Sequence, residues 1–230
     1  MTKPKSEELT TMSLPDVGLR FNAQRVGPKN FIGLRNADYG KGFRMPTMPE
    51  IVPLVHASLE NKNDDITKDV IKTLEKHWLT ENTGILYVLK KMFVQDNPEL
   101  KDGRISMNQE VLESKLGSHE EKGVVFSDDR SIRFTSYDFK RGLQHPLQLY
   151  INKGIIALVG GEENSEKLAE VSGHYKASPY FGVLGYTSSP TIRVADMYIH
   201  HLINQLIIRA NNDESFSDNY SFGVQKIKQE

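Results

Sequence analysis

The sequence predicts an α+β protein with a mixed, mainly antiparallel sheet and two to four helices, and three observations carry this expectation. Between Lys41 and Glu60, turn residues, a helix start and an apolar helix face follow one another. Several short segments alternate apolar and polar residues, which is typical of half-buried strands. Clusters of glycine, proline, asparagine and aspartate separate these segments, as expected for turns between strands.

The composition indicates a globular protein. The chain has 230 residues, 38% of them hydrophobic and 26% charged, with a net charge of −1. A chain of this length can bury a substantial core. We expect a flexible N-terminus over residues 1–13 and a single mixed α+β domain over residues 14–230, with a sub-boundary near residues 140–153 as the alternative division.

Composition also excludes several functions. The balanced charge gives no chain-wide basic field, so we expect no nucleic-acid partner. No apolar run is long enough to span a membrane, and residues 1–16 lack the apolar region of a secretory signal, so we expect no membrane association. The chain has no cysteine, which excludes disulfides, zinc–thiolate sites and cysteine catalysis. These features are consistent with the cytoplasm, where we expect the protein to be located.

The segment Lys41–Glu60 predicts the first long helix. Thr47 and Glu50 have the spacing of a capping box, in which each side chain bonds to the other residue's amide. Pro49 lies in the first turn, where a missing amide donor has no cost. Ile51, Leu54, Val55 and Leu59 then form one face. Pro53 either kinks the helix or marks the start of its regular part.

Within this segment, Gly42-Phe43-Arg44-Met45-Pro46-Thr47 with Glu50 resembles the G-[W/F]-R-L-P-T-x-x-E segment of the formylglycine-generating-enzyme-like proteins. A related bacterial lipoprotein family of unknown function carries the same segment. The resemblance implies a C-type-lectin-like fold, in which this segment opens the first helix and a terminal strand corresponds to Tyr220–Val224. Those families are rich in tryptophan, whereas this chain has one, Trp78. The catalytic members use cysteines, so their activity is not implied here.

Other elements of the first half follow from local patterns. Strands are expected around Leu19–Phe21 and Asn30–Leu34, and a second helix capped by Asp64 or Asp65 carries an apolar face that ends at Trp78. We interpret Trp78 as a core residue at this helix end. After a break at Thr80–Gly84, the sequence predicts strands at Gly84–Leu89 and Met92–Gln95 and a short helix at Gln109–Leu116.

The second half begins with a predicted hairpin of Val124–Phe126 and Ser131–Tyr137 around a polar turn. Gly154–Val159 is the most apolar segment and predicts a central strand. A helix is expected at Glu162–Ser172. The segment Ile192–Leu206 is ambiguous: Ile192 and Val194 fit a strand, and the apolar residues over Ile199–Ala210 fit a helix after it. The last expected strand is Tyr220–Ile227.

No motif predicts a cofactor, a metal or a catalytic site. Gly160-Gly161 before a helix is not a phosphate-binding motif, and Glu162 and Glu163 place negative charge where a phosphate would bind. Asp128-Asp129 offers too few ligands for calcium. His200-His201 are adjacent and would not share a helix face. The G-x-S-x-G motif of many hydrolases is also absent from the sequence.

The sequence therefore favours a non-catalytic binding or interaction module that presents a loop surface to a protein or an unidentified ligand. From residue type and loop position, we expect this surface to include Arg130, Arg133, Tyr137 and Tyr180. Two alternatives stay open. One is a hydrolase-type enzyme with a dispersed active site. The other is a structural subunit of a larger assembly, with an apolar face near Ile199–Ala210. The oligomeric state does not follow from the sequence.

Overall fold

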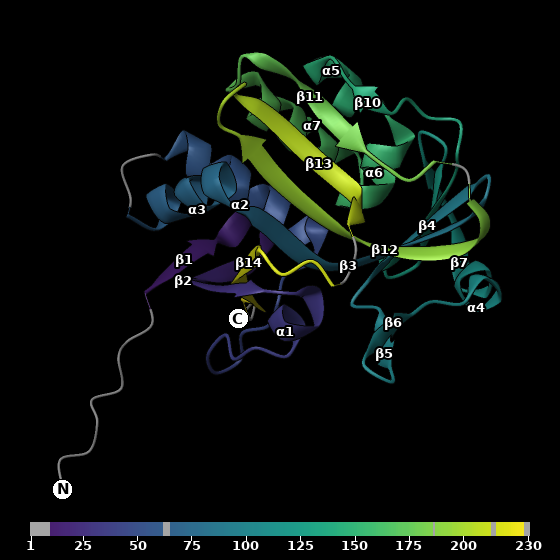
Figure 1. The fold of residues 1–230 in the computed structure, drawn as a ribbon, viewed down its shortest axis with the longest axis horizontal. Helices are drawn as coiled ribbons and strands as arrows, with labels where there is room; N and C mark the ends of the chain where they lie inside the picture. Colours follow the sequence, from purple (N-terminus) through teal and green to yellow (C-terminus); the bar gives the residue numbers. More distant parts are fainter. Residues whose placement is uncertain (1–9, 62–64, 186, 213–214, 228–230) are drawn as a thin grey trace, which may run out of the picture.

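A large, mainly antiparallel sheet organises the protein in the computed structural model, which describes residues 10–61, 65–185, 187–212 and 215–227. The strands along its main path run in the order β10-β11-β13-β12-β3-β4-β9-β8-β7 (Figure 1). Among the described strands, the pairs β11–β13 and β14–β3 are parallel and the other pairs are antiparallel. The strands on this path are β3 (Trp78–Leu89), β4 (Lys91–Asp96), β7 (Leu116–Glu121), β8 (Val124–Ser127), β9 (Ile132–Ser136), β10 (Gly142–Leu143), β11 (Ala177–Gly182), β12 (Thr187–His200) and β13 (Gln205–Asn212).

The first and last strands of the chain pair with each other. β2 (Leu19–Lys29) lies antiparallel between β1 (Thr11–Leu14) and β14 (Asn219–Lys226), and β14 joins this unit to the start of β3. The terminal strand expected at Tyr220–Ile227 is thereby confirmed. Residues 1–9 of the expected flexible N-terminus lie outside the described residues, whereas Thr11–Leu14 form β1, preceding the short 3-10 turn η1 (Pro15–Val17).

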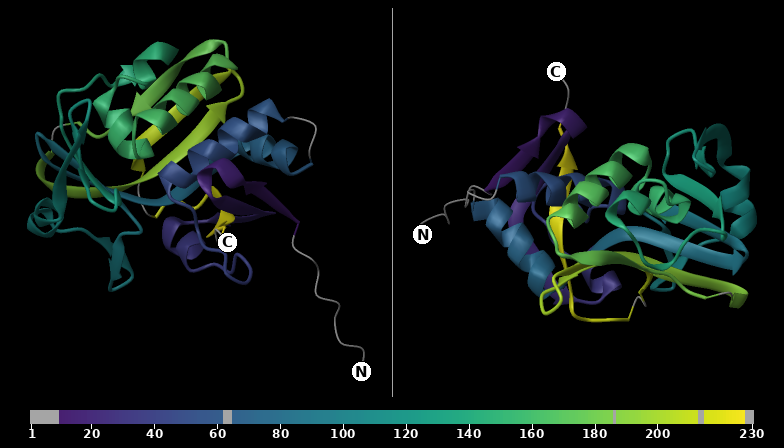
Figure 2. Two further views of the ribbon diagram at one scale, coloured as in Figure 1. Left: turned by 180° about the vertical axis from the view of Figure 1, so that it is seen from behind. Right: turned by 90° about the horizontal axis from the view of Figure 1, so that it is seen from above.

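One face of the sheet is covered by helices, and the long helix predicted from the Lys41–Glu60 segment is among them. α2 (Met48–Glu60) begins with the expected capping box, in which the Glu50 carboxylate accepts a hydrogen bond from the Thr47 amide at 2.9 Å. Pro53 lies inside the helix. The second predicted helix is α3 (Asp65–Lys76), and the predicted helix at Glu162–Ser172 is α7 (Glu162–Gly173). Figure 2 shows these helices on the same side of the strands.

The expected central strand at Gly154–Val159 is wrong, because this segment forms α6 (Lys153–Val159). The Asn152 side chain accepts from the Gly154 amide at 3.0 Å and begins the helix, and Gly160 ends it with a φ of 86°. The helix is buried on all sides, so its apolar run has no periodicity that would separate it from a buried strand. The short α5 (Pro146–Leu149) precedes it.

The helix expected over Ile199–Ala210 is also wrong. This segment is a β-hairpin, formed by the end of β12 and the start of β13, with His200 paired to Gln205. Asn204 takes a positive φ of 52° in the turn. Ile199, Leu206, Ile208 and Ala210 all point into the main core, and their apparent helical spacing arises because the turn interrupts a two-residue alternation.

β3 begins earlier than expected. The expected break at Thr80–Gly84 lies within this strand, and Trp78 is its first residue rather than the end of a helix. Against β12, Asp196 pairs with Thr80 but Val194 pairs with Gly84, so residues 81–83 form a bulge. The bulge hides the alternation of the strand, which is why the sequence reads as irregular there.

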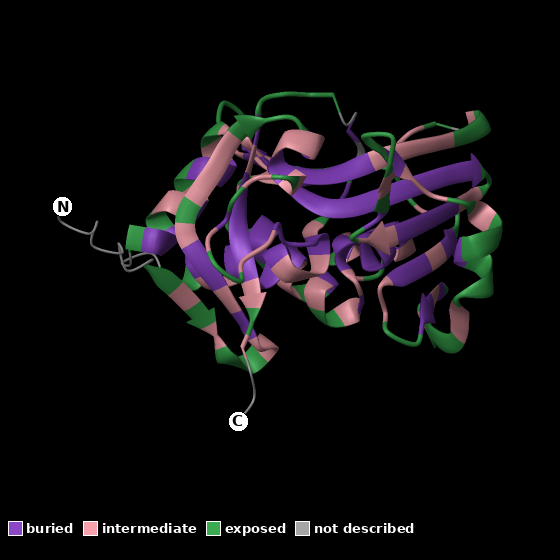
Figure 3. Ribbon diagram, turned by 90° about the horizontal axis from the view of Figure 1, so that it is seen from below, coloured by how far each residue is buried: buried purple, intermediate pink, exposed green. Residues whose placement is uncertain are grey.

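The opposite face of the sheet is covered only in places. α1 (Phe31–Arg35) packs there with a second core cluster, and α4 (Gln109–Ser114) contributes Leu112 to a third. α1 replaces the expected strand at Asn30–Leu34, since the Asn30 side chain accepts from the Gly33 amide at 2.8 Å and caps a helix. A separate hairpin joins β5 (Glu99–Lys101) and β6 (Arg104–Ser106). Figure 3 shows the buried central strands of the sheet.

The described part of the chain contains seven α-helices, more than the two to four expected, because α1, α4, α5 and α6 are short. The α+β class and the mainly antiparallel sheet are confirmed. Of the helices described, none is long and apolar enough to cross a bilayer. Around β10, β11, β13 and the end of β12, helices cover one face of the sheet while the other faces outward (Figure 1).

Candidate functional site

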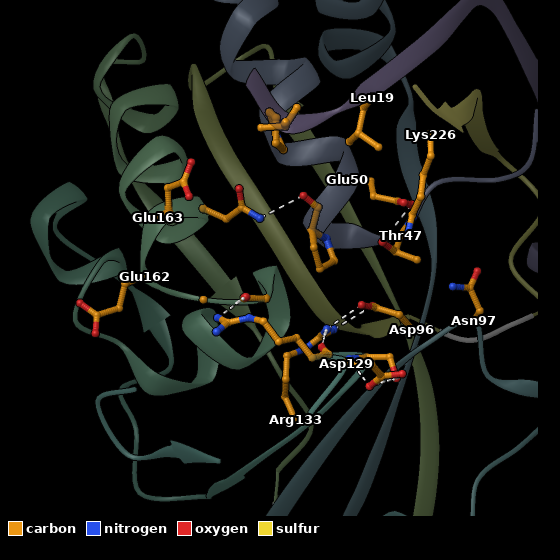
Figure 4. A pocket seen from close by; sticks show the side chains of 18 of the residues that line it. Leu19, Thr47, Glu50, Asp96, Asn97, Asp129, Arg133, Glu162, Glu163 and Lys226 are labelled. Atoms are coloured by element: carbon orange, nitrogen blue, oxygen red, sulfur yellow. Dashed lines mark hydrogen bonds and ion pairs between the residues drawn. The ribbon is translucent and has the colours of Figure 1, made fainter. Parts of the chain in front are cut away.

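A cleft of about 820 Å³ lies where the start of α2, the β8–β9 turn and the junction between α6 and α7 meet (Figure 4). Its lining is rich in charge, with seven acidic and four basic residues. These are Asp16, Glu50, Asp96, Glu121, Asp129, Glu162 and Glu163, and Arg44, Arg130, Arg133 and Lys226.

Two bidentate ion pairs fix the base of this cleft. Arg133, on β9, donates from its two terminal nitrogens to the Asp96 carboxylate of β4 at 2.6 and 2.8 Å. Arg44 binds Glu50 in the same way at 2.8 and 2.5 Å. Burial alone would raise the pKa of Glu50, but Arg44 and the Thr47 donors hold it below its usual value. The Glu50 carboxylate is therefore ionised, and both carboxylates already have an arginine partner.

The third arginine of the cleft, Arg130, links the β8–β9 turn to β7 and to the end of α6. Arg130 donates to Glu121 at 2.6 Å and to the Gly160 carbonyl at 3.1 Å. The second Glu121 oxygen accepts from the Glu162 amide at 3.1 Å, so a carboxylate already caps the start of α7. A Cβ atom at Gly161 would lie 2.6 Å from Arg130, so this close approach needs glycine.

Among its described residues, the cleft does not place a serine nucleophile beside a histidine base. No histidine is among the described residues that line it, and the Ser131 hydroxyl donates to Asp129 instead of facing a base. Its arginines are each paired with a carboxylate. In the described ranges, moreover, no group of three or more histidine, cysteine, aspartate or glutamate residues could hold a metal ion. The cleft is thus a preformed, charge-paired structure.

A second feature lies on the outward face of the sheet. Tyr198 of β12 pairs with Ile207 of β13, Ile207 pairs with Tyr180 of β11, and Tyr180 pairs with Leu143 of β10. Residues paired in register project from the same face. The Trp78 ring stacks on Tyr198, with ring centroids 4.8 Å apart. We call Trp78, Tyr198, Ile207, Tyr180 and Leu143 the aromatic row.

The aromatic row is accessible from outside. Tyr180 and Leu143 are 42% and 59% exposed, and the other three residues are partly buried. A contiguous line of apolar side chains across neighbouring strands differs from the scattered single residues that are common on protein surfaces. The row is therefore a candidate contact surface.

An arginine is clamped beside this row. Arg209, on β13, donates from Nε and Nη2 to the Asp196 carboxylate of β12 at 2.8 and 2.5 Å. Its guanidinium carbon lies 3.3 Å from the centroid of the Trp78 ring and 5.6 Å from that of Phe216. The salt bridge and the two rings hold the guanidinium in one orientation.

Two buried carboxyl groups lie beneath the row. Asp196 is fully buried, which raises its pKa to about 6 although Arg209 acts in the opposite direction. Glu81, in the β3 bulge, is also fully buried, and neither of its oxygens has a hydrogen-bond partner. Burial, and then the Asp196 charge, raise the pKa of Glu81 well above its usual value. Glu81 therefore favours the neutral form, whereas Asp196 takes up a proton at a higher pH than an ordinary aspartate would.

The four residues expected to share a recognition surface are divided between these features. Arg130 and Arg133 line the cleft, and Arg133 is completely buried. Tyr137 is 6% exposed and packs edge-on against Tyr87, while Tyr180 belongs to the aromatic row. Arg133 and Tyr180 both lie within strands and not on loops, and the predicted hairpin strand Ser131–Tyr137 already includes Arg133.

Sequence reasoning missed Trp78, Tyr198 and Arg209. The signal that could have found them is the alternation in Val194–His200 and Gln205–Ala210, which places Asp196 and Tyr198 on one face of a strand. Reading that stretch as a helix hid the alternation.

Comparison with known proteins supports the fold. No family model and no curated protein sequence matches the chain. A solved structure described as "Accommodation of massive sequence variation in Nanoarchaeota by the C-type lectin fold" is similar, with a TM-score of 0.53 and 16% identity. The match covers 96% of this chain and 99% of that one. The protein therefore has a C-type lectin fold, as the resemblance of Gly42–Glu50 implied, and nothing in these comparisons links it to formylglycine-generating enzymes.

Proposed function

We propose that this protein is a non-catalytic binding module that recognises a protein partner through the aromatic row and the adjoining Arg209. The observation that carries this proposal is the register of four neighbouring strands, which aligns Tyr198, Ile207, Tyr180 and Leu143 on one uncovered face. Such a face is rigid, because its backbone is held by the sheet.

The residue types support recognition of a protein. Tryptophan, tyrosine and arginine are enriched among the residues that contribute most to protein–protein binding. Trp78, Tyr198 and Tyr180 provide large contact areas with few rotatable bonds, so little conformational entropy is lost when a partner covers them. Of the residues expected from the sequence, Tyr180 is proposed as a contact, and Arg133 and Tyr137 as supports of the scaffold.

The fold is also suitable for this role. The similar structure is described as a C-type lectin fold that accommodates massive sequence variation. A scaffold that tolerates many surface sequences is suited to recognition, since the contact residues can change while the core stays the same. A hydrolase is less well supported, because the charged cleft has no nucleophile with an adjacent base among its described residues.

The test is affinity capture with the immobilised protein from a lysate of its source cells, followed by mass spectrometry. We expect wild-type protein to retain a specific partner and Tyr180→Asp to lose it, because a charge at this position interrupts the apolar row. Val111→Asp is the matched control, since Val111 is 50% exposed on α4, outside the row. Retention of the same partner by Tyr180→Asp would contradict the proposal.

A further inference from the structure

Arg209 has hydrogen-bond donors without a partner among the described residues. A guanidinium carries five N–H donors. Arg209 gives one from Nε and one from Nη2 to Asp196, whereas Nη1 makes no hydrogen bond with any residue in the described ranges. The side chain is 23% exposed while Asp196 is fully buried. One side of the guanidinium is therefore anchored to Asp196, and the remaining N–H groups are free to bind another acceptor.

Aromatic rings border these donors. The Trp78 ring lies against the guanidinium, and Phe216 is a second ring nearby. Rings exclude water from the flanks of the guanidinium, and a hydrogen bond to a charged donor is stronger where water is excluded. The ring and the salt bridge also remove the rotamer freedom that a free arginine would lose on binding. Arg209 is thus preorganised to receive an acceptor.

The four strands of this face expose no carboxylate. Asp196 is the only acidic residue in β10, β11, β12 and β13, and it is buried. Asp218, before β14, is exposed beside Trp78, but it lies 3.9 Å from the His77 ring, which can pair with it. Lys176 is exposed immediately before β11, and the His200 ring lies 6.0 Å from the Tyr198 ring. No carboxylate on these strands would therefore repel a negatively charged group that approaches the aromatic row.

We infer that Arg209 receives a carboxylate of the protein partner, so that the aromatic row binds an acidic segment. This inference rests on the proposed function and specifies the chemistry of the partner at that same face. The carboxylate accepts hydrogen bonds from Nη1 and the free N–H of Nη2, and the apolar side chains of the segment lie along Tyr198, Ile207 and Tyr180. Asp196 acts as a positioning residue that orients Arg209 without contacting the partner.

The protein carries its own reporter for this contact. Trp78 is the only tryptophan in the chain, and it lies against Arg209. The probe is a capped peptide of alternating glutamate and leucine. The control is the same peptide with lysine in place of glutamate. We expect the acidic peptide to change the Trp78 fluorescence saturably, and the basic peptide to bind at least tenfold more weakly.

Two variants test the assignment to Arg209. Arg209→Gln should weaken the acidic peptide at least tenfold, and Arg209→Lys should weaken it severalfold, because lysine keeps the charge but lacks the planar fork. Arg209→Lys also leaves Asp196 with a cationic partner, so it remains informative if Arg209→Gln does not fold. Arg104→Gln, on the β5–β6 hairpin, is the control and should bind within twofold of wild type.

The inference is overturned if both peptides bind equally, if neither binds, or if both Arg209 variants bind the acidic peptide as wild type does. A saturable response to an oligothymidine strand without a response to the acidic peptide would also overturn it, since the face would then bind nucleic acid. Failure of the proposed function is distinguishable, because it appears as a captured partner that Tyr180→Asp still retains. A partner lost in Tyr180→Asp but bound by Arg209→Gln with wild-type affinity would reject only the present inference.

Discussion

Two arginine–aspartate pairs bridge neighbouring strands in this protein. They differ in whether the arginine or the aspartate is the more deeply buried partner. In the cleft, Arg133 is 1% exposed and its partner Asp96 is 11% exposed. On the open face the order is reversed, because Asp196 is fully buried and Arg209 is 23% exposed. Both pairs are bidentate.

The difference shows why similar geometry serves different purposes. Arg133 directs its terminal nitrogens inward, to Asp96 and to the Arg130 carbonyl, and it ties β4 to β9. Arg209 is anchored by the buried Asp196, and its remaining N–H donors are available on the open face. A buried carboxylate can also take up a proton, whereas a buried guanidinium cannot lose one. The two pairs should therefore respond differently to the loss of a partner.

The largest effect is expected for Asp96→Ala, which leaves the fully buried Arg133 without its anion. Removal of one partner from a buried ion pair costs about 3–5 kcal/mol. We expect this loss to be the same at pH 5 and pH 8, because arginine stays protonated throughout. Urea unfolding at both values measures it. Glu163→Ala is the control, since it removes an exposed pair with Lys167 and should cost less than about 0.5 kcal/mol. A loss below about 1 kcal/mol for Asp96→Ala would contradict the expectation that the buried Arg133 depends on its anion.

A smaller, pH-dependent loss is expected for Arg209→Ala. The variant leaves Asp196 buried without a cation, so its pKa rises further above the value of about 6. A carboxyl whose pKa is raised by folding stabilises the native state at low pH, and this stabilisation is lost as the pH rises through the folded-state pKa. The variant should therefore lose about 3 kcal/mol at pH 8 and clearly less at pH 5. An equal loss at both values would show that Asp196 does not take up the proton.

The next effect has the opposite sign. Glu81 is buried and both its oxygens lack partners, so replacing it with an apolar side chain of similar size removes a cost. We expect Glu81→Leu to raise the free energy of unfolding by about 1–2 kcal/mol at pH 8. The gain should shrink at pH 5, because this pH is close to the ordinary glutamate pKa of 4.5 and ionisation of Glu81 then favours the unfolded state less. Differential scanning calorimetry at the two pH values tests this, and a destabilised variant would contradict it.

The smallest effect is expected at the open face. Tyr180 is 42% exposed, so Tyr180→Ala should change the free energy of unfolding by less than about 0.5 kcal/mol. The adjacent Phe181 points into the main core, and Phe181→Ala should cost about 3–5 kcal/mol. Chemical unfolding of both variants gives the contrast. A large loss for Tyr180→Ala would mean that the aromatic row supports the fold instead of facing a partner.

Local signals predicted the parts of the fold that depend on a few adjacent residues. The capping box of Thr47 and Glu50 and the hairpin around Ser127–Arg130 both follow from neighbouring side chains. α6 and the β12–β13 hairpin could not be predicted in this way. α6 is buried on all sides, so its apolar run has no face, whereas the alternation of the β12–β13 hairpin is interrupted by its turn. In both segments, tertiary neighbours select helix or strand.

The candidate site was harder to predict than the fold. Arg130 and Tyr180 were identified by residue type, but their positions in different features depend on strand order. Trp78 and Tyr198 are 120 residues apart and meet only because β3 pairs with β12. Arg209 gains its role from Asp196 across a strand pair that the sequence reading had taken for a helix. Register, rather than composition, creates this surface.

The pairing of β2 with β14 has a consequence for how the protein folds. Their register joins Lys29 to Asn219 and Leu19 to Lys226, positions 190 and 207 residues apart. Contacts this distant require a large loop to close before they contribute, which slows folding. Until β14 has left the ribosome, β2 and the start of β3 expose unpaired strand edges. During synthesis these edges are where we expect chaperones to bind the nascent chain.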